Sequence, residues 1–176
     1  MAEAARSIRL LAMDVDGVLT SGDVIYLDAG AEIKVFNIQD GLGISAARHA
    51  GLGIAVITGR ASQAVERRAS ELGVIHVRQG CRDKGAALRQ LMAETGLRRE
   101  EVAFIGDDLN DIPAFRECGW KVAVSNASQD LKVLADHVTE RQGGHGAVRE
   151  VIELILQCQG KWTRAVEEYL RDLEQS

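Results

Sequence analysis

The chain has little proline, few cysteines and no long apolar run. One proline among 176 residues, with no low-complexity segment, excludes a long proline-rich linker. Cys81, Cys118 and Cys158 are odd in number and widely spaced, which argues against a disulfide framework or a zinc motif and indicates a reducing compartment. No run reaches the roughly 20 apolar residues of a membrane span. Residues 1–9 include Glu3 and lack the apolar stretch of a signal peptide, so we expect a cytoplasmic protein.

The chain also lacks an excess of positive charge. Its net charge of -5 gives no reason to expect nucleic acid or an anionic membrane as partner. An anionic substrate would therefore need a locally positive site. The length of 176 residues fits one domain, which buries roughly 70% of the surface of its unfolded chain.

Short apolar runs alternate with helical patterns, which predicts an α/β fold with a doubly wound, Rossmann-like parallel sheet. We expect strands at residues 10–15, 53–58, 76–78, 102–106, 121–124 and 137–139. Helices are expected at residues 43–50, 62–72, 84–95, 111–117 and 128–135. Four glycines follow helices as C-caps do, namely Gly51, Gly73, Gly96 and Gly119.

One segment interrupts this alternation directly after the first strand. Residues 24–27 and 32–38 are strand-like and are joined by Asp28-Ala29-Gly30, which predicts an inserted β-hairpin flap at about residues 22–38. The hairpin is too apolar for a solvated excursion, which favours contact with a partner chain. Its apolar residues are Ile25, Leu27, Ile33, Val35 and Phe36.

The end of the chain carries two apolar stripes at helical spacing. The first, from Val148 to Leu156, is expected to pack on the core and to complete a domain of residues 1–159. The second lies in a helical tail of residues 160–176, between Trp162 and Leu173. This tail is either a helix packed on its own domain, which we favour, or a contact with another subunit.

Two acidic residues follow the first strand in the run Asp14-Val15-Asp16-Gly17. Open α/β sheets bind their ligands at the carboxyl ends of the strands. Two carboxylates this close repel each other unless a cation or a proton lies between them. In chemical terms, one carboxylate can attack an electrophile while the other transfers a proton. A strand followed by a turn with solvated acids is the alternative.

Three further groups are predicted at other strand ends and helix starts. Thr58-Gly59-Arg60 offers a hydroxyl and amide donors that suit a phosphate, although it is equally a threonine N-cap. Lys84 begins a helix, where the helix dipole disfavours a positive charge, so its ammonium is either solvated or serves an anion. Gly106-Asp107-Asp108-Leu109-Asn110-Asp111 adds a second acidic cluster.

Together these groups supply what phosphoryl transfer needs. The set contains an oxygen nucleophile, an acid for the leaving group, cationic donors for phosphoryl oxygens, and carboxylates for a hard cation such as Mg²⁺. Asp14, one acid of the second cluster and a backbone carbonyl would make a partial magnesium shell, completed by water and substrate.

The ordered motifs resemble those of the haloacid dehalogenase superfamily of phosphatases. The likeness covers about residues 10–159 and includes Asp14-Val15-Asp16-Gly17-Val18-Leu19-Thr20, Phe36-Asn37-Ile38-Gln39-Asp40-Gly41 and Gly143-Gly144-His145-Gly146. These segments look like the capless subgroup that acts on sugar-acid phosphates, which implies a role in lipopolysaccharide precursor synthesis. Members often have arginine at the position of His145, so this change either alters substrate handling or falls in a flexible turn.

The resemblance implies a role for each matching residue. Asp14 would be the nucleophile and a Mg²⁺ ligand, and Asp16 the acid and base whose backbone carbonyl also binds the metal. Thr58 and Lys84 would hold the phosphoryl group, and Asp107 would complete the metal ligands. Asp108 and Asp111 would support them. The implied substrate-binding residues are Asn37, Ile38, Gln39, Asp40, Gly41, Ser45, Gly59, Arg60 and Arg68.

The implied assembly is a homotetramer formed through the hairpin and the C-terminal tail, and the implied substrate is a small acidic sugar phosphate. An eight-carbon acid is favoured over a nine-carbon acid. A phospho-accepting receiver has its acid pair on the first strand and its accepting aspartate on a later one. This chain has the Asp14-Val15-Asp16 motif on the first strand and a second acidic cluster after Lys84, so a receiver is disfavoured. A non-catalytic oligomerisation module is disfavoured because the acids and Lys84 are intact.

Overall fold

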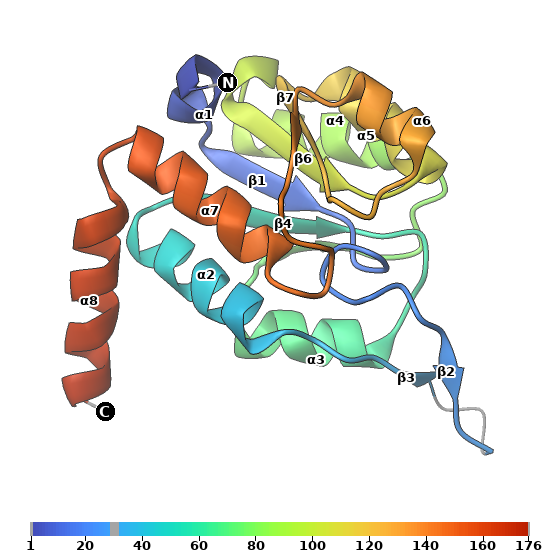
Figure 1. The fold of residues 1–176 in the computed structure, drawn as a ribbon, viewed down its shortest axis with the longest axis horizontal. Helices are drawn as coiled ribbons and strands as arrows, with labels where there is room; N and C mark the ends of the chain where they lie inside the picture. The colour runs from blue at the N-terminus through green and yellow to red at the C-terminus, as the bar shows by residue number, and fades with distance from the viewer. Residues whose placement is uncertain (1, 29–31, 176) are drawn as a thin grey trace.

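The structure is a computed structural model that describes residues 2–28 and 32–175. Its centre is a six-stranded sheet in the order β5-β4-β1-β6-β7-β8, with every neighbouring pair parallel. This arrangement confirms the doubly wound α/β fold (Figure 1). The strands are β1 Leu10–Met13, β4 Gly53–Ile57, β5 His76–Arg78, β6 Val102–Gly106, β7 Trp120–Ala123 and β8 His137–Val138.

Helices cover both faces of the sheet. Figure 1 shows α4, α5 and α6 grouped on one side and α2, α3 and α7 on the other, as right-handed crossovers between parallel strands require. The helices are α1 Ala2–Ser7, α2 Ile38–His49, α3 Gln63–Glu71, α4 Lys84–Thr95, α5 Ile112–Glu117, α6 Gln129–Leu134, α7 Ala147–Cys158 and α8 Trp162–Gln175. Two short 3₁₀ turns, η1 Arg99–Glu101 and η2 Leu109–Asp111, flank β6.

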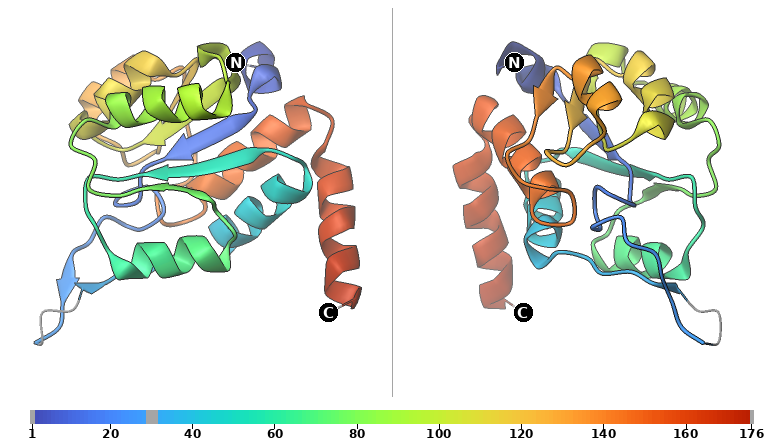
Figure 2. Two further views of the ribbon diagram at one scale, coloured as in Figure 1. Left: turned by 180° about the vertical axis from the view of Figure 1, so that it is seen from behind. Right: turned by 45° about the vertical axis from the view of Figure 1, so that its right-hand side comes forward.

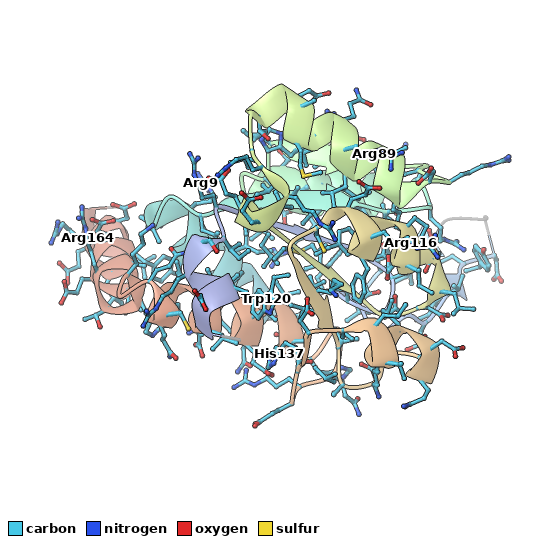
Figure 3. All side chains as sticks on the ribbon, turned by 90° about the horizontal axis from the view of Figure 1, so that it is seen from above. Arg9, Arg89, Arg116, Trp120, His137 and Arg164 are labelled. Carbon is cyan, nitrogen blue, oxygen red and sulfur yellow. The ribbon has the colours of Figure 1, made fainter. Side chains whose placement is uncertain are left out.

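The core lies between the sheet and these two helical layers. All residues of β1 and β6 are buried, as expected for central strands that are covered on both faces. At the edge of the core, the rings of Trp120 and His137 stack with their centroids 5.8 Å apart, and Figure 3 shows the two labelled side by side. The buried central strands therefore support the loops that leave the carboxyl end of the sheet.

The sequence prediction was wrong about where α2 begins. It placed the start at Gly43, whereas the helix begins at Ile38 and Asn37 caps it by accepting a hydrogen bond of 2.7 Å from the Gln39 amide. The glycines at its start are not helix breakers but close-contact positions. A Cβ at Gly43 would lie 3.1 Å from the Cα of Arg149 in α7, so glycine allows the two helices to approach.

The hairpin is present but shorter than predicted. Its strands β2 Ile25–Tyr26 and β3 Glu32–Ile33 pair antiparallel, so the second strand ends at residue 33 rather than 38. Ala29 and Gly30 of the predicted turn lie outside the described residues. Gly119 is also not a left-handed C-cap; a Cβ there would lie 2.6 Å from the Arg99 carbonyl oxygen, so close packing requires the glycine.

The hairpin and α8 lie at opposite ends of the molecule in all three ribbon views (Figures 1 and 2). Helix α8 packs beside α2 and α7, where Nε2 of His49 is 2.7 Å from Oδ2 of Asp172 and Arg149 lies over the ring of Trp162. These contacts support a tail packed on its own domain. No helix within the described residues is long and apolar enough to cross a membrane.

Candidate active site

The loop after β1 presents the first acid pair at the carboxyl edge of the sheet. The amide of Asp14 still donates to the carbonyl of Ile105 in β6, at 3.1 Å, so this residue continues the sheet register. The chain then coils tightly, because the carbonyl of Val15 accepts hydrogen bonds from three following amides. Gly17 has a φ of 86°, and a Cβ there would collide with the carboxylate of Asp107. This glycine therefore lets the two acidic loops meet.

Lys84 lies beneath the acids and is buried, with 1% of its side chain exposed. Its Nζ is 2.7 Å from Asp14 and 2.6 Å from Asp111, so the ammonium bridges carboxylates from two loops. Burial lowers the pKa of Lys84, but Asp111 and Asp14 more than offset this and raise the pKa above its ordinary value. The unfavourable position at the start of α4 is thus compensated by two buried acids. Lys84 remains charged at the centre of the site.

The acids themselves are destabilised as carboxylates. Burial, followed by the charge of Asp111, raises the pKa of Asp14 to about 6, although Lys84 opposes this shift. Burial and the charges of Asp111 and Asp14 raise the pKa of Asp107 to about 7. Desolvation and like charges disfavour ionisation in the same way at both groups. The site therefore carries more negative charge than its ammonium neutralises.

Carboxylate oxygens of Asp14, Asp107 and Asp111 lie within 4.8 Å of one another, close enough to surround one cation. The Oδ1 atom of Asp14 is buried and has no hydrogen-bond partner among the described residues. By contrast, Asp111 is committed: one oxygen contacts Lys84 and the other accepts from the Asp107 amide at 2.8 Å. Asp14 and Asp107 are consequently the side chains with oxygens left to offer a metal ion.

These groups open into a cavity of about 380 Å³ at the edge of the sheet. Thr58 is buried and directly follows β4, which lies on the other side of β1 from β6 and its acidic cluster. The structure thus brings together residues that are up to 96 positions apart in sequence. The lining residues are Asp14, Asp16, Gly22, Thr58, Gly59, Arg60, Asp107, Asp108, Leu109 and Asn110.

Four of the predicted substrate-binding residues border a different hollow. Asn37, Asp40, Gly41 and Arg68 line a small space of about 20 Å³ between α2 and α3. The carboxylate of Asp40 is buried and accepts hydrogen bonds from two amides at the start of α7, including that of Arg149 at 2.8 Å. In this structure Asp40 therefore ties α2 to α7.

The remaining predicted residues lie along α2. Ile38 and Gln39 are exposed at its start, and Oε1 of Gln39 accepts from Arg141 at 3.1 Å. Ser45 lies about two turns further along, and its carbonyl oxygen is 2.8 Å from Nδ1 of His49, beside α8. Ser45 is not among the residues that line the cavity of the acid pair.

The loop of residues 143–146 packs against the first acidic loop. The amide of Gly144 donates to the carbonyl of Val18 at 2.7 Å, and a Cβ at Gly143 would collide with the carbonyl of Gly17. His145 is exposed, and its Nδ1 lies 3.0 Å from the carbonyl oxygen of Gly143. The two glycines therefore support the loop that carries Asp14 and Asp16.

Sequence reasoning missed two site residues on the hairpin. Lys34 forms an ion pair with Asp16, and its Nζ also lies 3.4 Å from Glu32. A signal was available, because residues two apart in an extended segment face the same side. The pattern Glu32-Ile33-Lys34-Val35 alternates charged and apolar residues, and this alternation predicts one charged face.

Comparison with known proteins defines the class. The model of a family described as haloacid dehalogenase-like hydrolase matches residues 69–152. A curated relative, 3-deoxy-D-manno-octulosonate 8-phosphate phosphatase KdsC of Salmonella typhi, is 44% identical over 161 residues, covering 92% of this chain and 86% of that protein. The chain therefore belongs to the haloacid dehalogenase-like hydrolases, as the motifs predicted.

Within that class, several of the similar solved structures are 3-deoxy-D-manno-octulosonate 8-phosphate phosphatases. The enzyme from Moraxella catarrhalis, in complex with magnesium ion, phosphate ion and a KDO molecule, has a TM-score of 0.92 and 44% identity, covering 96% of this chain and 97% of that one. The cobalt-bound form of the corresponding phosphatase from Haemophilus influenzae has a TM-score of 0.88 and 41% identity. The match covers 91% of this chain and 94% of that chain.

Proposed function

We propose that this protein is a Mg²⁺-dependent phosphatase that hydrolyses 3-deoxy-D-manno-octulosonate 8-phosphate to the free sugar acid and inorganic phosphate. The observation that carries the proposal is the convergence of Asp14, Asp16, Thr58 and Asp107 on one cavity, with Lys84 paired to Asp14. The names of the similar proteins and the complex from Moraxella catarrhalis support the choice of substrate and metal.

The reaction starts at Asp14. Its carboxylate attacks the phosphorus atom, and the bond between phosphorus and the ester oxygen of the sugar breaks. Asp16 gives its proton to that oxygen, so the sugar leaves as a neutral alcohol. Asp16, now ionised, then accepts a proton from water while the water oxygen attacks the aspartyl-phosphate. Inorganic phosphate leaves, and both carboxyl groups return to their starting states.

The phosphoryl group carries negative charge throughout, and Lys84 and Thr58 are placed to hold it. The ammonium of Lys84 is preorganised by its two buried ion pairs, so it needs no reorganisation when charge moves onto the phosphoryl oxygens. The hydroxyl of Thr58, which lines the cavity directly after β4, supplies a further hydrogen-bond donor.

Asp14, Asp107 and the main-chain carbonyl of Asp16 would hold the magnesium ion. The bare buried oxygen of Asp14 and the raised pKa of Asp107 both fit residues that share a cation. When bound, Mg²⁺ neutralises the acids and polarises a phosphoryl oxygen. Asp108 and Asp111 support the site: the first caps η2, and the second holds Lys84.

We propose that the sugar is bound by residues at the open end of the cavity. Gly59 and Arg60 line the cavity, and the guanidinium of Arg60 suits an anionic substrate. Residues 37–41, Ser45 and Arg68 extend the proposed sugar-binding surface along α2 and α3. We further propose a homotetramer built through the hairpin and the tail, in the cytoplasm, acting in lipopolysaccharide precursor synthesis.

A single kinetic comparison tests the function and its rivals. Purified protein should release phosphate from the eight-carbon ester with at least about tenfold higher kcat/KM than from 2-keto-3-deoxynononate 9-phosphate or N-acylneuraminate 9-phosphate. EDTA should abolish the release and Mg²⁺ should restore it. Preference for a nine-carbon ester would reassign the substrate. Absence of Mg²⁺-dependent release from every ester would instead support a non-catalytic oligomerisation module.

A further inference from the structure

The hairpin turns a charged face toward the cavity and an apolar face outward. Glu32 and Lys34 have side chains that are 14% and 2% exposed, whereas their neighbours Ile33 and Val35 are 38% and 65% exposed. The period of two in an extended segment produces this separation. The two inward residues are the part of the hairpin that reaches the acid pair.

The inward charges form a closed ring with two residues of the cavity. Lys34 pairs with Oδ1 of Asp16 and lies 3.4 Å from Glu32. Glu32 in turn accepts a hydrogen bond of 2.8 Å from Arg60, whose Nε lies 3.9 Å from Oδ2 of Asp16. Each carboxylate in the ring thus contacts both cations, and Tyr26 accepts a further hydrogen bond from Arg60 at 3.4 Å.

This ring fixes one carboxylate that the reaction uses. One oxygen of Asp16 faces Lys34 and the other faces Arg60, so rotation of the carboxyl group would break an ion pair. Burial of a lysine ammonium carries a desolvation cost, and an apolar residue of similar volume often gives equal or greater stability. The ring is therefore poorly explained as a source of stability, and its geometry relates it to the orientation of Asp16.

We propose that Lys34 and Glu32 are positioning residues that orient the carboxyl group of Asp16 for proton transfer to the leaving group. Lys34 holds the carboxyl group directly. Glu32 acts through Lys34 and Arg60, because it pairs with both cations and balances their charge, so that Asp16 can still carry the proton it transfers. This inference rests on the proposed phosphatase function and adds the hairpin to its machinery. It also means that the flap is a working part of the site within a single chain.

The test separates proton transfer from phosphate binding by varying the leaving group. An alkyl sugar phosphate needs a proton on its departing oxygen, whereas p-nitrophenyl phosphate releases p-nitrophenolate, which is stable as an anion. The ratio kcat/KM reports only the steps through departure of the leaving group, so water attack on the phosphoenzyme does not enter. Phenyl phosphate, whose leaving group is less acidic than p-nitrophenol, shows whether an effect follows leaving-group acidity rather than sugar recognition.

For Lys34→Met we expect kcat/KM for the eight-carbon sugar phosphate to fall about 100-fold, a typical contribution of a positioned acid, with less than about threefold loss for p-nitrophenyl phosphate. Phenyl phosphate should fall in between. Lys34→Arg should recover most of the loss because it keeps the charge. Glu32→Gln should lower kcat/KM less than Lys34→Met does, with the three esters ranked in the same order. Lys121→Met removes a lysine paired with Asp136 outside the cavity and should leave kcat/KM for all three esters at the wild-type value.

Equal losses for the three esters in both Lys34→Met and Glu32→Gln would overturn the inference, because a merely structural role affects all substrates alike. Circular dichroism and melting temperature establish that each variant is folded. If Lys34→Met does not fold, Lys34→Arg and Glu32→Gln decide the question by the same comparison. A wild-type protein inactive on every ester would overturn the proposed function and, with it, this inference.

Discussion

Three carboxylates and one ammonium share the buried cluster at the end of β1. Lys84 sits between Asp14 and Asp111, and Asp107 has to share the remaining space with both acids. The raised pKa values of Asp14 and Asp107 express the cost of that arrangement. At the scale of single residues, the site is therefore built for a further positive charge.

The stability of the metal-free protein should depend on Asp107. Its pKa of about 7 in the fold exceeds the ordinary value of 3.8, so between these values the folded state binds the proton that the unfolded state has lost. Stability contributed by this group is accordingly lost as pH rises through that window. In EDTA at pH 8, Asp107→Asn should therefore be more stable than wild type by about 1 to 2 kcal/mol. This gain is smaller than the full pKa shift implies, because solvent screens part of the Asp107 carboxylate.

With Mg²⁺ present, the wild type should instead be more stable than Asp107→Asn. Binding to the folded state raises the free energy of unfolding of the wild type, whereas the variant lacks one ligand. Urea unfolding at pH 8, with EDTA and with Mg²⁺, measures both differences. Lower stability of Asp107→Asn in EDTA would show that this carboxylate is not strained in the metal-free site.

At the scale of elements, the hairpin is the clearest departure from a plain doubly wound sheet. Its inner face belongs to the site, and its outer face leaves large apolar side chains in water, including Ile25 at 44% and Val35 at 65% exposure. Contiguous exposed apolar surface of this kind marks protein interaction sites. At the far end of the molecule, α8 packs on α2 and still exposes Leu170 and Leu173.

The proposed assembly predicts a mass that one hairpin substitution reduces. Sedimentation equilibrium should give about four times the chain mass of 19.1 kDa for wild type. Ile25→Asp places a charge on the exposed apolar face and should lower the mass. Val133→Asp, at a more exposed apolar position on α6, should leave the mass unchanged. A monomeric wild type at micromolar concentration would contradict the proposed tetramer.

At the scale of the whole molecule, parallel strands bring distant segments to one edge. Asp14, Thr58 and Asp107 each follow a strand that pairs in register with a neighbour, so the sheet fixes their separation. The sequence was sufficient to predict this convergence, because each motif directly followed an apolar run of strand length. These residues were predictable since their positions depend on local pattern and on one general property of parallel sheets.

Other positions were not predictable from local pattern. The contact of Lys34 with Asp16 depends on how the hairpin folds back, and the hydrogen bonds of Asp40 depend on a helix that starts more than 100 residues later. The early start of α2 was missed because its glycines resemble a loop, whereas tertiary packing against Arg149 gives at least one of them a place in the helix. Long-range contacts of this kind override local propensity.

Turnover by Asp14→Asn measures whether Asp14 is the nucleophile of a phosphatase active site. The substitution keeps the volume of the side chain and removes the attacking oxygen anion, so kcat for the eight-carbon sugar phosphate should fall by at least about 1,000-fold. Circular dichroism should show an unchanged fold, and Asp130→Asn, at an exposed carboxylate on α6, should retain full activity. Near-wild-type hydrolysis by freshly prepared, folded Asp14→Asn would contradict the assignment of this cavity as a phosphatase active site.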